Sequence, residues 1–539
     1  MGNIFSYPDS RIVETSYGQI QGRRLIYMGE KQVDAFQGIP YAEPPVGKLR
    51  FEKPHPPAKW SGIEATKGFR KRAIQAPILF FDHFLKGFPS EDCLYLNVFT
   101  PCWDPPKEGF PVMVFIHGGG FEIGETNAYG DLNICENIVT RDVIFVTIAY
   151  RLGYLGFFTT GDDVCPGNFG LWDQTAALRW VNENIEAFGG NKNNITLLGQ
   201  SAGAVSTDLL HLSPHSTGLF HKMIPMAGTA EIRRLAGMSR NMPKQCSEKV
   251  SRLGLTDFKN NKELLDKLRT LPANKFAVEV KVFKKKRDDN NLFETIPYID
   301  GDFFSGSIDE MRKNATPKPM MTGITKEEGI LFIIGKKPTE DNLSTAISIA
   351  AIDGPDNEQL LNDLRDLYTS DEVLMNDEKM MRAIANVVSD YYMNAGALEM
   401  CRKAVTHHDE PVYLYVFDHF NPKIMGFLAR MIPIQDTTHG CELLFLFKKG
   451  IFFSTPSLND DDRVVMDAFT TAFTNFAKFG NPNGSDSSKT ELPSEWLPVD
   501  KTNCGRNFVF TPRKSQMKDE FFEGRPAKYM DILDKHQAC

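Results

Sequence analysis

Residues 194–203 of this 539-residue chain read Asn-Ile-Thr-Leu-Leu-Gly-Gln-Ser-Ala-Gly. The first five predict a buried strand, and the residues from Ala202 to Leu212 have the composition of a helix. A serine in Gly-x-Ser-x-Gly between a strand and a helix is a nucleophile elbow, whose glycines permit a strained turn that exposes the serine Oγ. Chance alone gives about 0.2 such pentapeptides in a chain of this length, so the pentapeptide by itself is weak evidence. The strand before it and the helix after it strengthen the prediction that Ser201 is a nucleophile.

Strand-like and helix-like segments alternate through the first half of the chain, which is typical of a parallel sheet with helical crossovers. The predicted strands are Val112–Ile116, Val143–Ile148 and Val412–Phe417, and the predicted helices are Leu171–Phe188, ended by Gly189-Gly190-Asn191, and Val464–Phe479, ended by Gly480. The segments 230–320 and 335–410 contain polar helical stretches without a clear partner. Since no Pro/Gly/Ser-rich linker divides the chain, we predict one domain over residues 11–539, preceded by an extension over residues 1–10.

The composition is that of an ordinary globular protein, with 42% apolar and 24% charged residues. A formal net charge of −8 argues against a nucleic-acid partner. The one dense basic run, Lys284–Arg287, is followed by two aspartates and predicts a solvated loop. The nine cysteines are scattered without a Cys/His cluster, so we expect no metal, and the predicted chemistry requires no organic cofactor.

The two ends of the chain predict an intracellular protein. The N-terminus lacks a secretory signal, and no apolar run is long enough to span a membrane. Met1-Gly2-x-x-x-Ser6 matches the N-myristoylation pattern, with Gly2 as the acceptor. A single myristoyl chain gives weak, reversible membrane binding, so we expect a cytoplasmic protein that associates reversibly with the cytoplasmic face of a membrane when it is modified. The sequence does not predict an oligomeric state.

A glycine-rich loop, His117-Gly118-Gly119-Gly120-Phe121, directly follows a predicted strand. Without Cβ atoms, its backbone N–H groups can approach a substrate carbonyl and form an oxyanion hole together with the N–H of the residue after the nucleophile.

A serine also needs a base and an orienting carboxylate, and in this class of site the order along the chain is Ser, acid, His. Among the candidate histidines, we favour His439 as the base because Gly440 allows a tight turn after it. Of the other candidates, His407, His408 and His536 are predicted to be surface residues. The residues alone leave the acid open: Glu327 and Glu328 both precede Gly329, and many other acids compete.

From about residue 11 to residue 520, the chain resembles the type-B carboxylesterases of the cholinesterase-like α/β-hydrolase family. The segments that carry the resemblance are Phe36–Pro45, Ser90–Val98, His117–Phe121, Tyr150–Gly153, Gly167–Gln174 and Phe188–Gly203. The resemblance implies an α/β-hydrolase fold, with a central, mostly parallel twisted sheet flanked by helices and with large helical insertions that form a gorge. It also implies the roles of individual residues, namely Ser201 as nucleophile, Glu328 as orienting acid, His439 as general base, Gly119, Gly120 and Ala202 as oxyanion-hole donors, and Arg50–Glu91 and Arg151–Asp173 as structural ion pairs.

Two departures from the family pattern are informative. Extracellular members have one disulfide from the position of Cys93 to a cysteine roughly 25 residues upstream, and a second disulfide in a loop near the position of Cys246. In this chain the upstream stretch 68–77 holds no cysteine, and Cys246 has no second cysteine nearby. The loss of both disulfides fits a reducing compartment. Cholinesterases hold a quaternary ammonium against a tryptophan before Ser90 and carry Glu before the nucleophile. Here residues 78–85 contain no tryptophan and position 200 is a neutral Gln, so a cationic choline ester is not expected.

The sequence therefore predicts a serine carboxylic-ester hydrolase that acts on small, neutral, fairly apolar esters through an acyl-enzyme intermediate. The alternative is an acyltransferase, in which the hydroxyl of a metabolite clears the acyl group instead of water. A more remote alternative is a non-catalytic adhesion or scaffold member of the family; such members lack a functional nucleophile.

Overall fold

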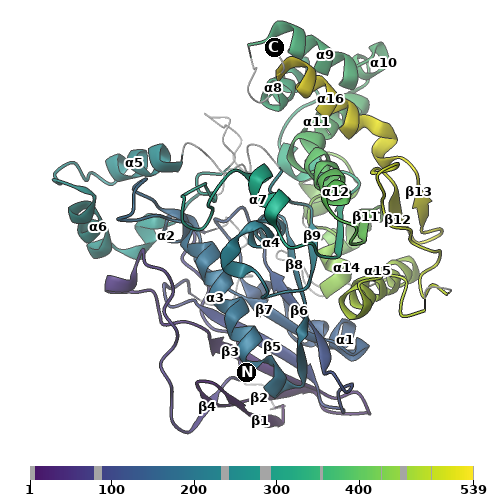
Figure 1. Ribbon diagram of the computed structural model, residues 1–539. Helices are drawn as coiled ribbons and strands as arrows, with labels where there is room; N and C mark the ends of the chain where they lie inside the picture. The colour runs from purple at the N-terminus through teal and green to yellow at the C-terminus, as the bar shows by residue number, and fades with distance from the viewer. Residues whose placement is uncertain are drawn as a thin grey trace.

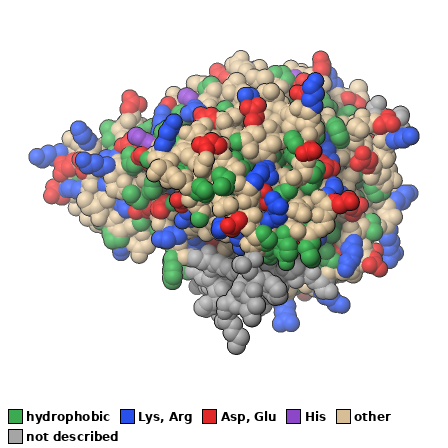
Figure 2. Space-filling view, turned by 90° about the horizontal axis from the view of Figure 1, so that it is seen from below, with side chains coloured by type: hydrophobic (Ala, Val, Ile, Leu, Met, Phe, Trp, Pro, Cys, Tyr) green, Lys and Arg blue, Asp and Glu red, His purple; other side chains and the backbone are tan. Residues whose placement is uncertain are grey.

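The computed structural model describes residues 7–77, 88–231, 242–279, 293–351, 356–426, 428–448, 458–486 and 489–537 (Figure 1). Gly2, the basic run Lys284–Arg287 and the loop 78–85 lie outside the described residues. Within the described part of the chain, no helix has the length and apolarity needed to cross a bilayer. On the described part of the face seen in Figure 2, acidic and basic side chains are interspersed, so this face presents no extended field of one sign.

The thirteen strands of the described residues form one sheet, in the order β1-β2-β3-β5-β7-β6-β8-β9-β10-β11-β12-β13, with β4 paired to β2. The strands are β1 (Asp9–Thr15), β2 (Gly18–Ile26), β3 (Val33–Pro40), β4 (Ile63–Ala65), β5 (Tyr95–Pro101), β6 (Phe110–Ile116), β7 (Ile144–Ile148), β8 (Gly190–Gln200), β9 (Lys222–Met226), β10 (Met320–Thr325), β11 (Val412–Phe417), β12 (Asn507–Phe510) and β13 (Gln516–Lys518).

Parallel pairing runs from β7 through β6, β8, β9, β10 and β11 to β12. Antiparallel pairing links β1, β2, β3, β5 and β7 at one side and β12 with β13 at the other. The central strands β6 and β7 are buried along their whole length, as their continuous apolar runs predict. The mostly parallel α/β sheet of the predicted fold class is confirmed.

The helices fall into a layer on the sheet and a set of insertions. They are α1 (Leu132–Asn137), α2 (Gly153–Phe157), α3 (Phe169–Asn184), α4 (Ala202–Leu212), α5 (Met242–Arg252), α6 (Asn261–Thr270), α7 (Ile308–Asn314), α8 (Glu340–Ala350), α9 (Glu358–Tyr368), α10 (Asp371–Leu374), α11 (Asp377–Ser389), α12 (Ala395–His407), α13 (Pro422–Met425), α14 (Leu443–Phe447), α15 (Asp460–Phe479) and α16 (Arg525–Gln537). Figure 1 shows α3 and α4 on one face of the sheet and α1 and α15 on the other.

The helices of residues 335–410, which lacked a clear partner in the sequence, pack on one another and on the C-terminal helix. Helix α11 contacts α8, and α16 contacts both α9 and α12. Figure 1 shows this group of helices beyond one end of the sheet. Because α16 lies more than a hundred residues further along the chain, nothing local in the sequence indicates this packing.

The predicted helix Leu171–Phe188 and the glycine stop after it need correction. The α-helix begins at Phe169 and ends at Asn184, and a 3₁₀ turn over Ile185–Phe188 completes the segment. Only Gly189, at φ 87°, ends the turn; Gly190 and Asn191 already belong to β8, in which Gly190 pairs with Phe110. The strand is therefore longer at both ends than the apolar run predicts.

Candidate active site

Ser201 stands at a strained turn between β8 and α4. Its backbone is at φ 57° and ψ −123°, a conformation that costs a non-glycine residue about 1–3 kcal/mol. The turn is held by the Ser201 N–H, which donates to the Met226 carbonyl at 2.9 Å, and by the Ser201 carbonyl, which accepts from the Val205 N–H in the first turn of α4. Among the described residues, the Ser201 Oγ has no hydrogen-bond partner.

The two glycines that flank this turn are required by close backbone contacts. A Cβ on Gly199 would lie 2.2 Å from the Gly203 carbonyl oxygen, and one on Gly203 would lie 2.1 Å from the Ile116 carbonyl oxygen at the end of β6. Both distances are far below van der Waals contact, so no side chain can be accommodated. The sequence interpretation of a glycine-dependent elbow agrees with this geometry.

The glycine loop that follows β6 lies beside Ser201. A Cβ on Gly118 would lie 2.9 Å from the Ser201 Cβ, which places the loop next to the nucleophile. Gly119 and Gly120 have φ values of 109° and 63°, in the region that glycine adopts without strain. The N–H of Ala202, the first residue of α4, stands at the positive end of that helix. Gly118 thus brings the glycine loop next to Ser201, and Ala202 directly follows the serine in the chain.

Glu328 and His439, which lie 111 residues apart in the chain, form a direct contact. The His439 Nδ1 is 2.5 Å from the Glu328 Oε2, and the Glu328 side chain is fully buried. The other carboxylate oxygen, Oε1, accepts from the N–H and the Oγ1 of Thr325 at 2.6 and 3.0 Å. The carboxylate is therefore fixed at the carboxyl end of β10, and it orients the imidazole.

The neighbouring acid, Glu327, faces away from the histidine. It pairs with Arg382 at 3.3 Å, and Arg382 also bonds Asp436. Burial, reinforced by the Asp436 carboxylate, raises the pKa of Glu327 from 4.5 to about 7, and the attraction of Arg382 offsets only part of this. Of the two acids that the residues alone leave open, only Glu328 contacts His439.

The raised pKa of Glu327 predicts a pH-dependent contribution to stability. An acid that binds its proton more tightly in the folded protein stabilises the fold at low pH, and this stability is lost as pH rises from 4.5 towards 7. We expect the free energy of unfolding of the wild type, relative to Glu327→Gln, to fall across this window by up to about 3 kcal/mol, at about 1.4 kcal/mol per pKa unit. Urea unfolding of both proteins at several pH values measures the difference; a difference independent of pH would contradict the prediction.

Two features near the histidine were not predicted from the sequence, namely the contact of Gln200 with its ring and the buried acid Glu442. The Nε2 of Gln200 lies 3.3 Å from the Nε2 of His439, so the amide contacts the ring nitrogen that a general base uses. Glu442 is fully buried, and both its burial and the Glu328 carboxylate raise its pKa well above the usual range. The sequence offered only two signals for them: Gln200 directly precedes Ser201, and Glu442 lies three residues after His439.

Elsewhere in the chain, the expectation that His536 is a surface residue is wrong. Its side chain is only 10% exposed and pairs with Asp363.

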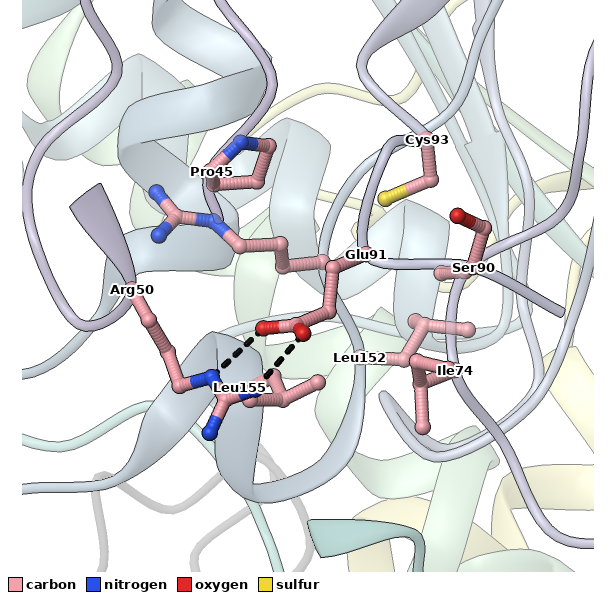
Figure 3. Close-up of a pocket in the computed structure, with 10 residues that line it drawn as sticks. Pro45, Arg50, Ile74, Ser90, Glu91, Cys93, Leu152 and Leu155 are labelled. Atoms are coloured by element: carbon pink, nitrogen blue, oxygen red, sulfur yellow. Dashed lines mark hydrogen bonds and ion pairs between the residues drawn. The ribbon is translucent and has the colours of Figure 1, made fainter. Parts of the chain in front are cut away.

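The two predicted structural ion pairs are present. Arg50 pairs with Glu91 through two bonds of 2.6 and 2.7 Å, beside the buried Cys93 (Figure 3). Arg151 and Asp173 form a bidentate pair at 2.7 and 2.8 Å, and both side chains are buried.

Cys93 and Cys246 both carry free thiols. Among the residues that the structure describes, no group of three or more His, Cys, Asp or Glu side chains is placed to hold a metal ion.

We expect Asp173→Asn to destabilise the fold by about 3–5 kcal/mol, because it leaves the guanidinium of Arg151 buried without a countercharge. A matched control is Glu186→Gln, which breaks the exposed pair with Lys192 and is expected to cost less than about 1 kcal/mol. Denaturant unfolding of the two variants gives both values. Equal losses would contradict the assignment of Arg151–Asp173 as a buried structural pair.

Comparison with known proteins adds the family context. The sequence profile of the carboxylesterase family matches residues 9–527. Esterase cest-33 of Caenorhabditis elegans is 36% identical, and the alignment covers 99% of this chain and 97% of that protein. The juvenile hormone esterase of Tribolium castaneum is 33% identical over 88% of this chain and 84% of its own. Carboxylesterase 5A of Mus musculus is 32% identical over 88% and 82%.

Proposed function

Because the chain belongs to the carboxylesterase family and is a serine carboxylesterase, we propose that it hydrolyses small, neutral, fairly apolar esters through an acyl-enzyme intermediate. One observation carries the assignment of residues. The buried Glu328–His439 pair is joined through Gln200 to the strained Ser201 turn, which lies against the glycine loop.

In the proposed first step, the Ser201 Oγ attacks the ester carbonyl carbon while the His439 Nε2 takes its proton. For this, Nε2 exchanges its contact with Gln200 for one with the serine, since catalytic hydrogen bonds often tighten only in the substrate complex. The N–H groups of Gly119, Gly120 and Ala202 donate to the oxyanion. When the carbonyl reforms, the ester C–O bond breaks and the alcohol leaves with the proton from His439.

The second step repeats the first with water. His439 removes a proton from a water molecule, whose oxygen attacks the acyl-enzyme, and the acid product leaves as Ser201 regains its proton. Glu328 keeps the Nδ1–H of the imidazole pointing at its carboxylate, which leaves Nε2 free to accept, and stabilises the imidazolium formed in each step.

The proposed substrate class rests on the surroundings of the reacting atoms. The Phe332 ring lies 5.2 Å from the His439 ring, and the Phe293 ring packs so closely on Gly120 that a Cβ there would lie 2.1 Å from it. Two apolar rings thus border the groups that would surround the carbonyl. The side chain next to the nucleophile is the neutral amide of Gln200, which offers no countercharge to a cationic ester.

Product analysis tests this function directly. Purified protein is given an activated short-chain ester, with and without millimolar alcohol or sugar acceptors, and a choline ester is compared with its isosteric 3,3-dimethylbutyl ester. We expect free acid to dominate under all conditions, and the neutral ester to have the higher kcat/KM. Acylated acceptor as the main product would establish an acyltransferase instead, and a preference for the choline ester would overturn the proposed substrate class.

A further inference from the structure

A cavity of about 130 Å³ lies at the edge of the sheet opposite to the candidate active site. Its lining includes Met223 and Met320, at the beginnings of β9 and β10, whereas Glu328 follows the carboxyl end of β10. The length of β10 separates the two places by about 20 Å, at about 3.3 Å per residue. By the same measure one water needs only about 10–15 Å³, so the cavity has room for a polyatomic ion.

The cavity is lined by basic side chains from the last turns of three helices. Helices α4 and α7 pack together, and α12 packs on β10 (Figure 1). Their ends and the loop after α7 contribute two lysines, an arginine and three histidines, and α12 adds a further lysine, Lys403, just before its last turn. Among the described residues that line it, none is an Asp or a Glu.

Two of these cations are neutralised by buried carboxylates behind the cavity wall. Arg312 bonds Asp208 at 2.8 and 3.0 Å and Glu231 at 2.6 Å. Lys403 bonds the other oxygen of Glu231 and the exposed Asp309. Because these carboxylates already neutralise Arg312 and Lys403, neither side chain requires an anionic ligand.

Lys318 has no such partner. It is 7% exposed, and within the described part of the chain no carboxylate or carbonyl lies within bonding distance of its ammonium. Its nearest charge-stabilising neighbour is the Phe220 ring, whose centroid is 5.0 Å from Nζ. Cations near helix ends can serve the helix dipoles, but Lys318 bonds no helix carbonyl, so this role does not account for it. Burial lowers the pKa of Lys318, so its charged form is costly there without a countercharge, and an anion in the cavity would offset that cost.

The imidazoles add unpaired nitrogen atoms to the same place. His211 uses Nε2–H to donate to the Thr316 carbonyl at 2.9 Å, which leaves Nδ1 as a buried lone pair without a partner. Burial lowers the pKa of His211 to about 4, so this lone pair persists at neutral pH. The Nδ1 of His408 is also buried without a partner. Both atoms are closed to a water-sized group, so the imidazoles line the cavity without offering it an acceptor, and the Lys318 ammonium is left as the donor to a ligand.

We propose that this cavity binds a phosphate group, free or as a small phosphate monoester, separately from the ester site. The charged oxygens of the phosphate accept from the Lys318 ammonium. Lys313, which also lines the cavity and has no ion pair within the described residues, adds to the positive potential at the site.

Calorimetric titration tests the proposal with the full chain. Inorganic phosphate, phenyl phosphate and sulfate are titrated into the wild type, Lys318→Met and Lys501→Met, the last being an exposed lysine that controls for net charge. We expect one saturable phosphate site in the wild type and in Lys501→Met, and binding at least about tenfold weaker in Lys318→Met. Ester hydrolysis by Lys318→Met is expected to match the wild type, which shows that the variant is folded.

The remaining outcomes separate the sources of the group. Binding of phenyl phosphate as tightly as phosphate identifies a monoester ligand, and binding of phosphate alone identifies the free ion. Sulfate, which is less basic than phosphate and so a weaker acceptor, is expected to bind more weakly; equal binding of sulfate would overturn the assignment to phosphate. No saturable phosphate binding by the wild type, or equal binding by Lys318→Met, would overturn the site.

Discussion

We expect Ser201→Ala to lower kcat for ester hydrolysis by about 10⁶-fold, because loss of the attacking oxygen removes the covalent route altogether. The remaining rate would come from the oxyanion donors and from substrate binding. The fold is expected to survive unchanged. The Oγ has no hydrogen-bond partner among the described residues, and the Ser201 N–H bond to Met226 does not depend on the side chain. Stability should therefore stay within about 0.5 kcal/mol of the wild type.

The measurement combines steady-state kinetics with covalent labelling. A fluorophosphonate transfers its phosphonyl group to a nucleophilic serine with loss of fluoride, so intact mass shows one adduct on the wild type and none on Ser201→Ala. Thermal unfolding of both proteins shows that the fold is retained. Turnover by Ser201→Ala close to that of the wild type, or an unchanged adduct, would refute the nucleophile.

Glu328→Gln is expected to lower kcat/KM by about 10⁴-fold, by analogy with loss of the carboxylate in other serine triads. A glutamine can present its NH₂ group to Nδ1, which favours the tautomer with a proton on Nε2. That ring cannot accept the serine proton, and its imidazolium is left without a countercharge. The bonds from Thr325 to Oε1 have an equivalent in the amide oxygen, so the backbone is expected to stay in place.

Glu327→Gln is the matched control, since it makes the same change one residue earlier and affects the pair with Arg382. We expect it to retain activity within about tenfold of the wild type, because its side chain does not reach His439. Parallel kinetics of the two variants decide between the acids. A severe loss in Glu327→Gln, with little loss in Glu328→Gln, would reverse the assignment.

The elbow and the central strands could be predicted from the sequence because their determinants are local. Gly199 and Gly203 are required by contacts within a few residues or with the adjacent strand, and the apolar run Val412–Phe417 is β11 as predicted. Gly440, at φ 81°, makes the turn that singled out His439.

Other features depend on contacts that no local pattern encodes. Glu327 and Glu328 are adjacent and chemically identical, and only the direction of the 3₁₀ turn after β10 sends one to His439 and the other to Arg382. The packing of α16 on α9 and α12 joins segments that are distant in the chain. The amide of Gln200 reaches His439 because the end of β8 meets the loop that carries the histidine, which neither segment shows by itself.

The contacts that hold the Ser201 turn against the glycine loop lie between residues 116 and 228, since Gly118, Gly203 and Gly228 all pack on this turn or on β6. Glu328 and His439 follow β10 and β11, which join the sheet beyond β9. On the proposed mechanism, the nucleophile and its oxyanion donors can assemble from the first half of the chain, before the base exists. During synthesis, we therefore expect the serine of the growing polypeptide to be unreactive, and hydrolytic activity to begin only after the segments with Glu328 and His439 have joined the sheet.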